Sequence, residues 1–255
     1  MRLKAKKQEN IRAIFRALYR RWGHQHWWPA ETQFEVIVGA YLTQNTAWTN
    51  VQRALEQLRM AGVLSVEGLR SIDVSELEKL IRSAGYFRQK AARLKQFITF
   101  LDQRYDGSLT RMFSIPTEQL REELLALNGI GPETADSILL YAGQHPIFVV
   151  DAYTRRILER HGLAKTSAKY EEIRTLIEGA LTDVVLPELV EINPATLPKG
   201  LCHAPSAMST TTRCAQAEVF NEMHGLIVGV GKNCCLKSKP KCEECPLGPL
   251  LTKRA

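Results

Sequence analysis

One carboxylate stands where an apolar run meets a segment that favours a helix. The run Ile147-Phe-Val-Val150 leads to Asp151, and Ala-Tyr-Thr-Arg-Arg follows. As a helix N-cap, Asp151 would accept amide hydrogen bonds, and the helix dipole would favour its ionised form. A cap contributes about 1 kcal/mol. A fixed anion can also stabilise positive charge that builds on C1′ of a sugar while an N-glycosidic bond breaks, and it can orient or activate water. Asp151 is therefore predicted to be either a simple cap or a catalytic carboxylate.

A second group of reactive side chains is the cysteine cluster near the end of the chain. Four of the six cysteines lie between Cys234 and Cys245, and three of them have the spacing Cys235-x6-Cys242-x2-Cys245. Such crowding suits metal ligation better than a disulfide framework in a reducing compartment. The thiolates could hold an iron–sulfur cluster or zinc, and a metal-free loop is the third possibility.

A glycine pair between two short apolar segments is the most informative local pattern. Residues 124–139 read Leu-Leu-Ala-Leu-Asn-Gly-Ile-Gly-Pro-Glu-Thr-Ala-Asp-Ser-Ile-Leu. Gly129 and Gly131 allow a tight turn and let a DNA phosphate approach the backbone. The amides of the turn and the start of the second helix would form an anion site. Ile130 would plug the space between the helices, and Ala135 would let them pack closely. Such a device holds a phosphate without reading sequence; the alternative is an ordinary helical hairpin.

Secondary-structure elements must position these side chains. The hydrophobic pattern of the sequence is mostly helical. No convincing strand pattern is present, so we expect an all-α fold with a small cysteine-rich C-terminal loop. Residues 187–212 carry four prolines and a Ser/Thr cluster, which predicts an irregular insertion. Helices are expected over 8–22, 33–43, 47–61, 75–84, 88–105, 117–127, 133–142, 152–161, 168–182 and 214–230.

The composition is that of an ordinary globular chain with an excess of basic residues. Apolar residues make up 45% and charged residues 24% of the 255 positions, and the formal net charge is +7. A positive charge favours a polyanionic partner, nucleic acid first and a membrane surface second. No stretch approaches the roughly 20 apolar residues of a membrane helix, and no apolar signal core follows the basic N-terminus. We therefore expect a cytoplasmic, nucleoid-associated protein with no membrane partner.

The hairpin, a one-helix spacer and Val-Val-Asp151 together resemble the helix-hairpin-helix (HhH-GPD) superfamily of DNA glycosylases, the endonuclease III branch in particular. Leu42-Thr-Gln-Asn-Thr46 looks like the glutamine loop of that family, and residues 83–94 look like another family segment. The likeness covers roughly residues 20–182 and 218–247.

The resemblance implies two interleaved lobes with double-stranded DNA in the groove between them and one damaged base flipped out. A six-helix lobe would span 31–144, and residues 1–30 with 145–255 would form the lobe that carries catalytic Asp151 and the cysteine loop. We expect a monomer. Gln44 would fill the space left by the extruded nucleotide. Candidate DNA contacts are Gln44, Gly129, Gly131 and Thr134, with Lys90, Arg93, Arg155 and Lys232 as candidate phosphate partners or merely solvated charges.

One departure from endonuclease III concerns its lysine nucleophile, whose amine attacks C1′ and forms a Schiff base. The matching position in the second hairpin helix is Glu133, and a carboxylate cannot form that imine. We therefore predict a monofunctional glycosylase that leaves the abasic site uncut. An endonuclease III-like oxidised-pyrimidine glycosylase with AP lyase activity and a non-catalytic DNA-damage binding module are the alternatives.

An aromatic cluster resembles the 3-methyladenine DNA glycosylase III branch, which has a Trp-Trp-Pro segment and an aromatic residue just after its glutamine loop. By that resemblance Trp27, Pro29 and Trp48 would line the base pocket. Indole faces attract a cationic alkylated base by about 0.5–2 kcal/mol. The branch also has a modified lysine that is matched here by Leu226, while a nearby basic position is kept as Lys232. The alternative is that the tryptophans are core residues, as we expect for Trp22.

The cysteines match the first three ligands of the endonuclease III [4Fe-4S] loop, namely Cys235, Cys242 and Cys245. The fourth family position is Leu251 here. Cys234, or Cys202 or Cys214 from the insertion side, could supply the missing thiolate. Three lysines lie within the loop where that family contacts DNA phosphates: Lys237, Lys239 and Lys241. The loop would be structural.

Overall fold

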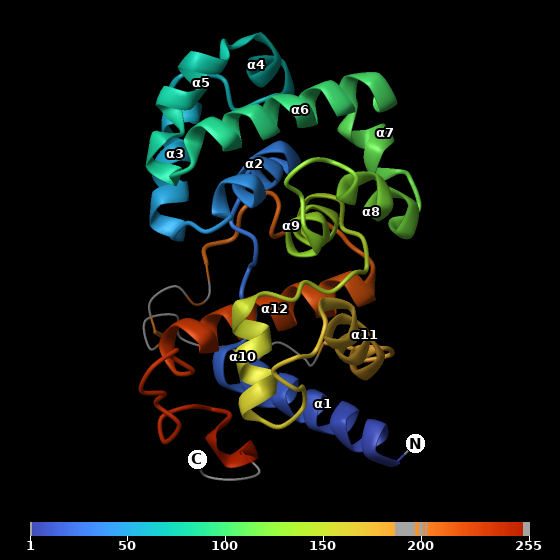
Figure 1. Ribbon diagram of the computed structural model, residues 1–255. Helices are drawn as coiled ribbons and strands as arrows, with labels where there is room; N and C mark the ends of the chain where they lie inside the picture. Colours follow the sequence, from blue (N-terminus) through green and yellow to red (C-terminus); the bar gives the residue numbers. More distant parts are fainter. Residues whose placement is uncertain (1, 187–196, 199–200, 202, 252–255) are drawn as a thin grey trace. The chain divides into compact units, whose positions relative to one another are not determined.

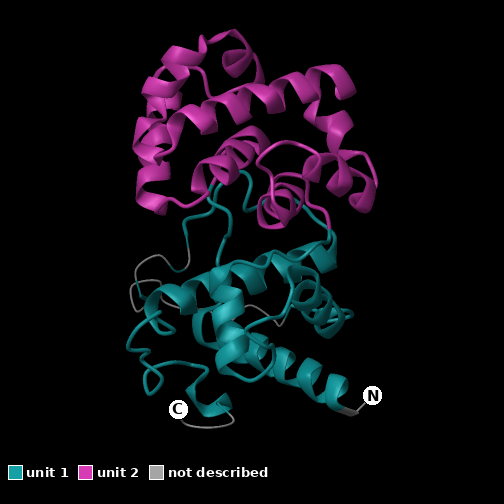
Figure 2. Cartoon of the chain, viewed as in Figure 1, with its two compact units in different colours: residues 1–29, 146–255 teal, residues 30–145 magenta. Residues whose placement is uncertain are grey.

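The computed structural model describes residues 2–186, 197–198, 201 and 203–251, and within that part of the chain it contains helices and no strand (Figure 1). The all-α prediction is confirmed. The chain divides into two compact units (Figure 2): unit 1 comprises residues 1–29 and 146–255, and unit 2 comprises residues 30–145. Much of the predicted insertion (187–196, 199–200 and 202, with Cys202) lies outside the described residues.

Unit 2 is built around α2 (Gln33–Thr43), whose residues from Phe34 to Leu42 are all buried. Two short helices, α4 and α7, are absent from the sequence-based prediction because each is too brief to show a periodicity. Helix α5 begins at Val74 with Asp73 as its N-cap, not at the predicted Ser75. The other elements are α3 (Trp48–Met60), α4 (Val66–Ser71), α5 (Val74–Leu80), η1 (Arg82–Ala84), α6 (Phe87–Tyr105), α7 (Leu109–Phe113), α8 (Thr117–Leu125), α9 (Pro132–Ser137) and a π-helical turn η2 (Ile138–Ala142).

Unit 1 combines the two ends of the chain. Helix α12 (Ala215–Asn233) is its centre, with every residue from Val219 to Gly231 buried. Helix α1 (Arg2–Trp22) packs against α11 and α12, and Trp22 is buried as predicted. The remaining elements are α10 (Ala152–Arg160), α11 (Tyr170–Leu181) and η4 (Gly248–Leu250).

Two glycines of α12 permit unusually close packing on that helix. A Cβ at Gly229 would lie 2.0 Å from Leu201, and one at Gly231 would lie 2.2 Å from the Tyr153 ring. Neither contact distance is sterically possible, so both positions need glycine despite its cost of about 1 kcal/mol within a helix. The residue identities of α12 are therefore set by what packs on it.

None of the helices in the described ranges is both long and apolar enough to cross a membrane.

Candidate functional site

The hairpin between α8 and α9 has the geometry that its glycines predict. Gly129 adopts a positive φ of 81°, and Gly131 is the exposed N-cap of α9. Ile130 is buried between the helices. A buried ion pair joins the two helices, with Arg121 Nε donating to Asp136 Oδ1 at 2.6 Å. The turn is thus held rigidly while its outer face stays open.

The glutamine loop is bonded to this turn. Gln44 Nε2 donates to Gly129 O at 2.9 Å and to Thr134 Oγ1 at 3.0 Å, and Arg93 Nη1 donates to Gln44 Oε1 at 2.8 Å. Three of the four predicted DNA contacts, Gln44, Gly129 and Thr134, therefore form one hydrogen-bonded group within unit 2.

Lys90 does not fit its predicted role as a phosphate partner. It is buried, and its Nζ donates to Leu42 O, Thr46 Oγ1 and Ala84 O at 2.7 to 2.8 Å. Burial, with Arg93 nearby, lowers the pKa of Lys90 to about 8. That prediction is wrong, because the amine satisfies buried carbonyls and shapes the glutamine loop instead.

Two further residues that the sequence singled out lie in the first turns of helices of unit 2. Trp48 is the first residue of α3 and is half-buried, so it is not a core residue. Glu133, which stands where endonuclease III has its lysine, is exposed in the first turn of α9.

Asp151 is the N-cap of α10, and its two carboxylate oxygens have different surroundings. Oδ1 accepts hydrogen bonds from Thr154 N at 2.7 Å and Thr154 Oγ1 at 2.8 Å. Oδ2 lies 3.7 Å from His224 Nε2, and the side chain keeps 13% of its surface exposed. One oxygen thus fixes the carboxylate on the helix, and the other can face a reactant.

His224 is a neighbour of Asp151 that the sequence reasoning did not identify. It lies on α12, buried, with its ring edge-on to Phe148 at 6.0 Å. Burial lowers the pKa of His224, although Asp151 opposes that shift. The imidazole is therefore neutral near pH 7, and it can stabilise Asp151 only by polar contact.

Trp27 and Lys232 form one group beside this carboxylate. Lys232 Nζ lies 5.9 Å from the centroid of the Trp27 ring, a cation–π distance. The ring also meets Trp28 edge-on at 5.6 Å, and Trp27 is only 8% exposed. Burial lowers the pKa of Lys232, while Asp151 raises it. Pro29 follows at the end of the same segment and is half-buried, and Leu226 is a fully buried residue of α12.

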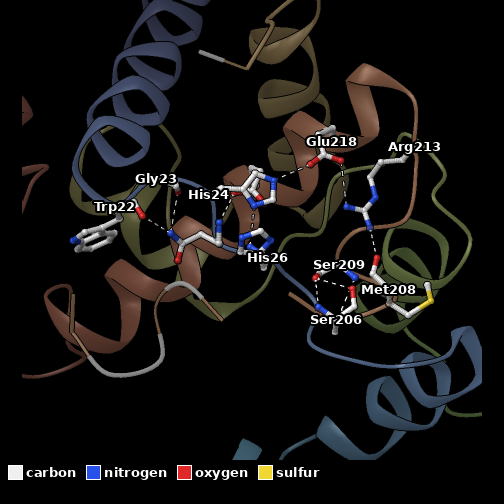
Figure 3. Close-up of polar contacts among 11 residues, drawn as sticks. Trp22, Gly23, His24, His26, Ser206, Met208, Ser209, Arg213 and Glu218 are labelled. Atoms are coloured by element: carbon white, nitrogen blue, oxygen red, sulfur yellow. Dashed lines mark hydrogen bonds and ion pairs between the residues drawn. The ribbon is translucent and has the colours of Figure 1, made fainter. Parts of the chain in front are cut away.

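The segment that carries Trp27 is fixed to α12 by a charged network (Figure 3). His24 Nε2 lies 3.2 Å from Glu218, and His24 Nδ1 lies 3.4 Å from buried Glu222. Gln25 N donates to Glu222 Oε2 at 2.7 Å. Burial raises the pKa of Glu222 to about 7, so this carboxyl group takes up a proton close to neutral pH.

Four cysteines line a single pocket of unit 1. They are Cys234, Cys235, Cys242 and Cys245, and Leu251 lies in the same wall. Cys214 is excluded as a fourth ligand, because it caps the opposite end of the 19-residue helix α12, about 28 Å away at 1.5 Å per residue. Four thiols around one enclosed space fit the ligand requirement of a cubane cluster.

Two arginines of α10 hold this cysteine loop, and the sequence reasoning missed both. Arg160 Nη1 donates to Cys235 Sγ at 3.1 Å and to Leu236 O at 2.7 Å. Arg156 donates to Cys235 O at 2.7 Å and stacks on Tyr153 at 5.0 Å. Their i, i+4 spacing places them on one helix face, which was the available signal. Arg155 donates to Ala168 O at 2.8 Å.

Comparison with known proteins gives a consistent result. The family model described as "HhH-GPD superfamily base excision DNA repair protein" matches residues 38–182. The chain is 40% identical over 247 residues to "Putative DNA repair glycosylase MJ1434" of Methanocaldococcus jannaschii, covering 96% of this chain and 97% of that protein.

Solved structures share the fold. H. pylori 3-methyladenine DNA glycosylase (MagIII) bound to 1,N6-ethenoadenine matches with a TM-score of 0.67 and 24% identity, over 90% of this chain and 97% of that one. A non-covalent endonuclease III–DNA complex matches with a TM-score of 0.69 and 20% identity, over 96% and 95%.

Proposed function

The chain is a DNA glycosylase of the HhH-GPD superfamily of base excision DNA repair proteins, and on that premise we propose that it is monofunctional and releases an alkylated, 3-methyladenine-like base. The observation that carries the proposal is the carboxylate of Asp151, fixed through Oδ1 with Oδ2 left to face a reactant. Exposed Glu133 at the position of the endonuclease III lysine supports hydrolysis without a Schiff base.

In this mechanism Asp151 acts on the sugar. As the N-glycosidic bond lengthens, positive charge grows at C1′, and the Oδ2 anion stabilises it without any reorganisation. The same oxygen orients the water that attacks C1′. Neutral His224, 3.7 Å from Oδ2, leaves the negative charge of the carboxylate in place. An alkylated purine carries positive charge, so it leaves readily and needs no strong general acid.

The hairpin would hold the DNA backbone. Gly131, the amides at the start of α9 and the helix dipole form an anion site for one phosphate. Gln44 is placed by Arg93, Gly129 and Thr134, and it would occupy the space that the flipped nucleotide vacates. The DNA partner is therefore a duplex with one extruded base.

In unit 1, the base pocket would use Trp27, Pro29 and Lys232. An indole face attracts a cationic base, but Lys232 already lies over Trp27. A cationic base must therefore displace the ammonium from the face of the ring.

We also propose that Cys234, Cys235, Cys242 and Cys245 hold a [4Fe-4S] cluster, with Cys234 in place of the family's fourth ligand. The pocket that they line together supports this ligand set. When bound, the cluster supplies no redox step; it cross-links the loop. Arg160 donates to Cys235 Sγ and so offsets part of the negative charge of the thiolates. The loop then presents Lys237, Lys239 and Lys241, all exposed, to DNA phosphates.

The test uses duplexes that carry 3-methyladenine, uracil or thymine glycol, scored for nicks with and without alkali. We expect base release from the alkylated duplex and nicks only after alkali. Asp151→Asn should lower the single-turnover rate by about 10²–10³-fold, while its amide oxygen still caps α10, so the stability should hold.

Two results would overturn the proposal. Nicks on thymine glycol without alkali, together with borohydride trapping of a covalent adduct, would establish the endonuclease III-like lyase instead. Full activity of Asp151→Asn would remove the carboxylate from the mechanism.

A further inference from the structure

The stretch from Leu201 to Arg213 follows residues outside the described part, and it is anchored tightly to unit 1. The Leu201 side chain occupies the space over Gly229, where a Cβ would lie 2.0 Å from it. His203 N donates to Gln25 O at 3.0 Å, and Gln25 N in turn donates to Glu222 on α12. Two independent contacts therefore fix the start of this stretch beside the segment that carries Trp27.

The end of the stretch is anchored as well (Figure 3). Ser206 and Ser209 bond to each other, with Ser206 N donating to Ser209 Oγ at 2.8 Å. Arg213 donates to Met208 O at 2.7 Å and to Glu218 at 3.2 Å. Glu218 also contacts His24, so the stretch joins the network that positions the Trp27 segment.

These anchors place the His203 ring against Trp27. The ring centroids are 5.4 Å apart with an interplanar angle of 54°. His203 Nε2 is buried, and no group in the described part of the chain offers it a hydrogen bond. A buried polar atom without a partner lowers the stability of the folded protein, because it has given up its hydrogen bond to water. That cost is recovered when a ligand supplies the missing hydrogen bond.

His203 is also chemically suited to a base. Burial lowers its pKa, and Lys232 and His26 add to the shift, so the ring is neutral. A neutral imidazole has one donor and one acceptor. It does not repel a cationic base, whereas an imidazolium would.

We propose that His203 contacts the extruded base: its ring nitrogen reads the polar edge of the base while Trp27 stacks against the base plane. The inference rests on the proposed function, because it assigns a role in the same pocket. The ligand class is a nucleobase with a carbonyl, amino or ring N–H group at that edge. His203 is then a residue that determines specificity, and the anchored stretch from Leu201 to Arg213 exists to place it.

The experiment compares His203→Phe with His203→Asn. Phenylalanine keeps a ring against Trp27 and removes the nitrogens, whereas asparagine keeps a donor and an acceptor. His145→Phe is the matched control, because His145 in unit 2 also has a buried, unpaired Nε2. We measure single-turnover rates on the three damaged duplexes, and the Kd for a duplex with a tetrahydrofuran abasic site.

His203→Phe should lower the rate on the best substrate at least 10-fold and bring the rates on the three substrates closer together, since leaving one buried polar group unpaired changes an equilibrium or rate by about 5–150-fold. His203→Asn should recover part of this loss. Kd for the abasic duplex, which carries no base, should stay within twofold, and His145→Phe should keep the wild-type ratio.

Equal rates for His203→Phe and wild type would overturn the inference, as would an equal loss on every duplex with weaker abasic binding, which marks a structural role. These outcomes are separate from those of the proposed function. If the wild type releases only uracil or thymine glycol, the proposed alkylated substrate is wrong. The role of His203 is still tested, because the same variants are then measured on the base that the wild type does release.

Discussion

The hairpin region of unit 2 and the α12 region of unit 1 treat polar side chains in opposite ways. Around the hairpin, hydrogen bonds within the protein are made by Lys90 Nζ, Arg93 Nη1 and both amide atoms of Gln44. Around α12, several buried polar atoms have no hydrogen-bond partner among the described residues: Tyr19 Oη, His26 Nδ1, His203 Nε2, and Oδ1 and Nδ2 of Asn221.

The difference follows from what each region would contact. A phosphate is held by backbone amides at an exposed turn, so the side chains behind it can be fully satisfied before DNA arrives. A flipped base is recognised by side chains in a desolvated pocket, and these side chains need hydrogen-bond donors and acceptors that are not already used within the protein. We therefore infer that the bonded side chains behind the hairpin belong to the scaffold, and that unsatisfied groups beside Trp27, such as His203, serve recognition.

The largest effect is expected at the buried ion pair of the hairpin. Arg121→Ala leaves the buried carboxylate of Asp136 without its cation, which should lower the free energy of unfolding by about 3–5 kcal/mol. Arg70→Ala is the control, since the Arg70–Asp102 pair is exposed and should cost no more than about 1 kcal/mol. Denaturant unfolding measures both. Equal losses would show that burial does not distinguish these pairs.

The two hairpin glycines should respond differently. Gly129→Ala places a side chain at φ 81° and within 2.0 Å of Arg93, which should cost about 1–2 kcal/mol of stability. Gly131→Ser meets open space at an N-cap, so stability should hold while affinity for duplex DNA falls. Thermal unfolding and DNA titration check this. Unchanged affinity of Gly131→Ser would argue against a phosphate at the turn.

Stability should fall as pH rises across the network under Trp27. The folded-state pKa of Glu222 is raised from 4.5 to about 7, so the folded chain holds a proton that the unfolded chain releases between those values. Unfolding free energy therefore decreases from about pH 4.5 to 7 and then levels off. The raised pKa of His24 adds a decrease as its proton is lost.

Glu222→Gln replaces the titrating carboxyl group by an amide, so the decrease in unfolding free energy between pH 5 and 8 should become smaller by on the order of 1 kcal/mol. The amide oxygen can still accept the hydrogen bond from Gln25 N, so the fold should be kept. Unfolding at several pH values measures it. Glu56→Gln, at an exposed ion pair, serves as control. A wild-type slope in Glu222→Gln would contradict the assignment.

The smallest effect concerns the cysteine loop. Lys237→Ala should reduce the slope of log Kd against log salt by about 1 and leave stability unchanged, because one exposed phosphate contact is lost. Lys79→Ala, already paired with Glu76 in unit 2, should leave the slope as it is. An unchanged slope for Lys237→Ala would remove this loop from the DNA interface.

The sequence predicts what is local and misses what depends on folding. Trp22 is buried as its place on the apolar face of a helix predicts, and Ile130 is buried as its place between the two hairpin helices predicts. The burial of Lys90 is not predictable from the local pattern, because its ammonium donates to the carbonyl of Leu42, which lies 48 residues away in the sequence. The sequence contains no pattern that identifies His203, because its position depends on the packing of the Leu201 side chain over Gly229.

The cysteine site was predictable from the sequence only in part. Their spacing predicted a shared site, but the choice among Cys202, Cys214 and Cys234 needed the length of α12. Only the structure brings Cys234 into the pocket with the other three, and Cys214 lies at the far end of the helix.

Unit 1 is built from two segments that are far apart in the sequence, so its parts are synthesised at different times. Helix α1, with its buried residues Ile11, Ile14 and Leu18, is translated before the rest of unit 1. Helices α11 and α12, against which it packs, follow roughly 150 residues later or more. At about 5–20 residues per second, this apolar face waits roughly 7–30 s for its partners. Unit 2 is complete well before that, so its continuous chain can fold while α1 remains exposed to chaperones. Slow translation should therefore lower the yield of unit 1 more than that of unit 2.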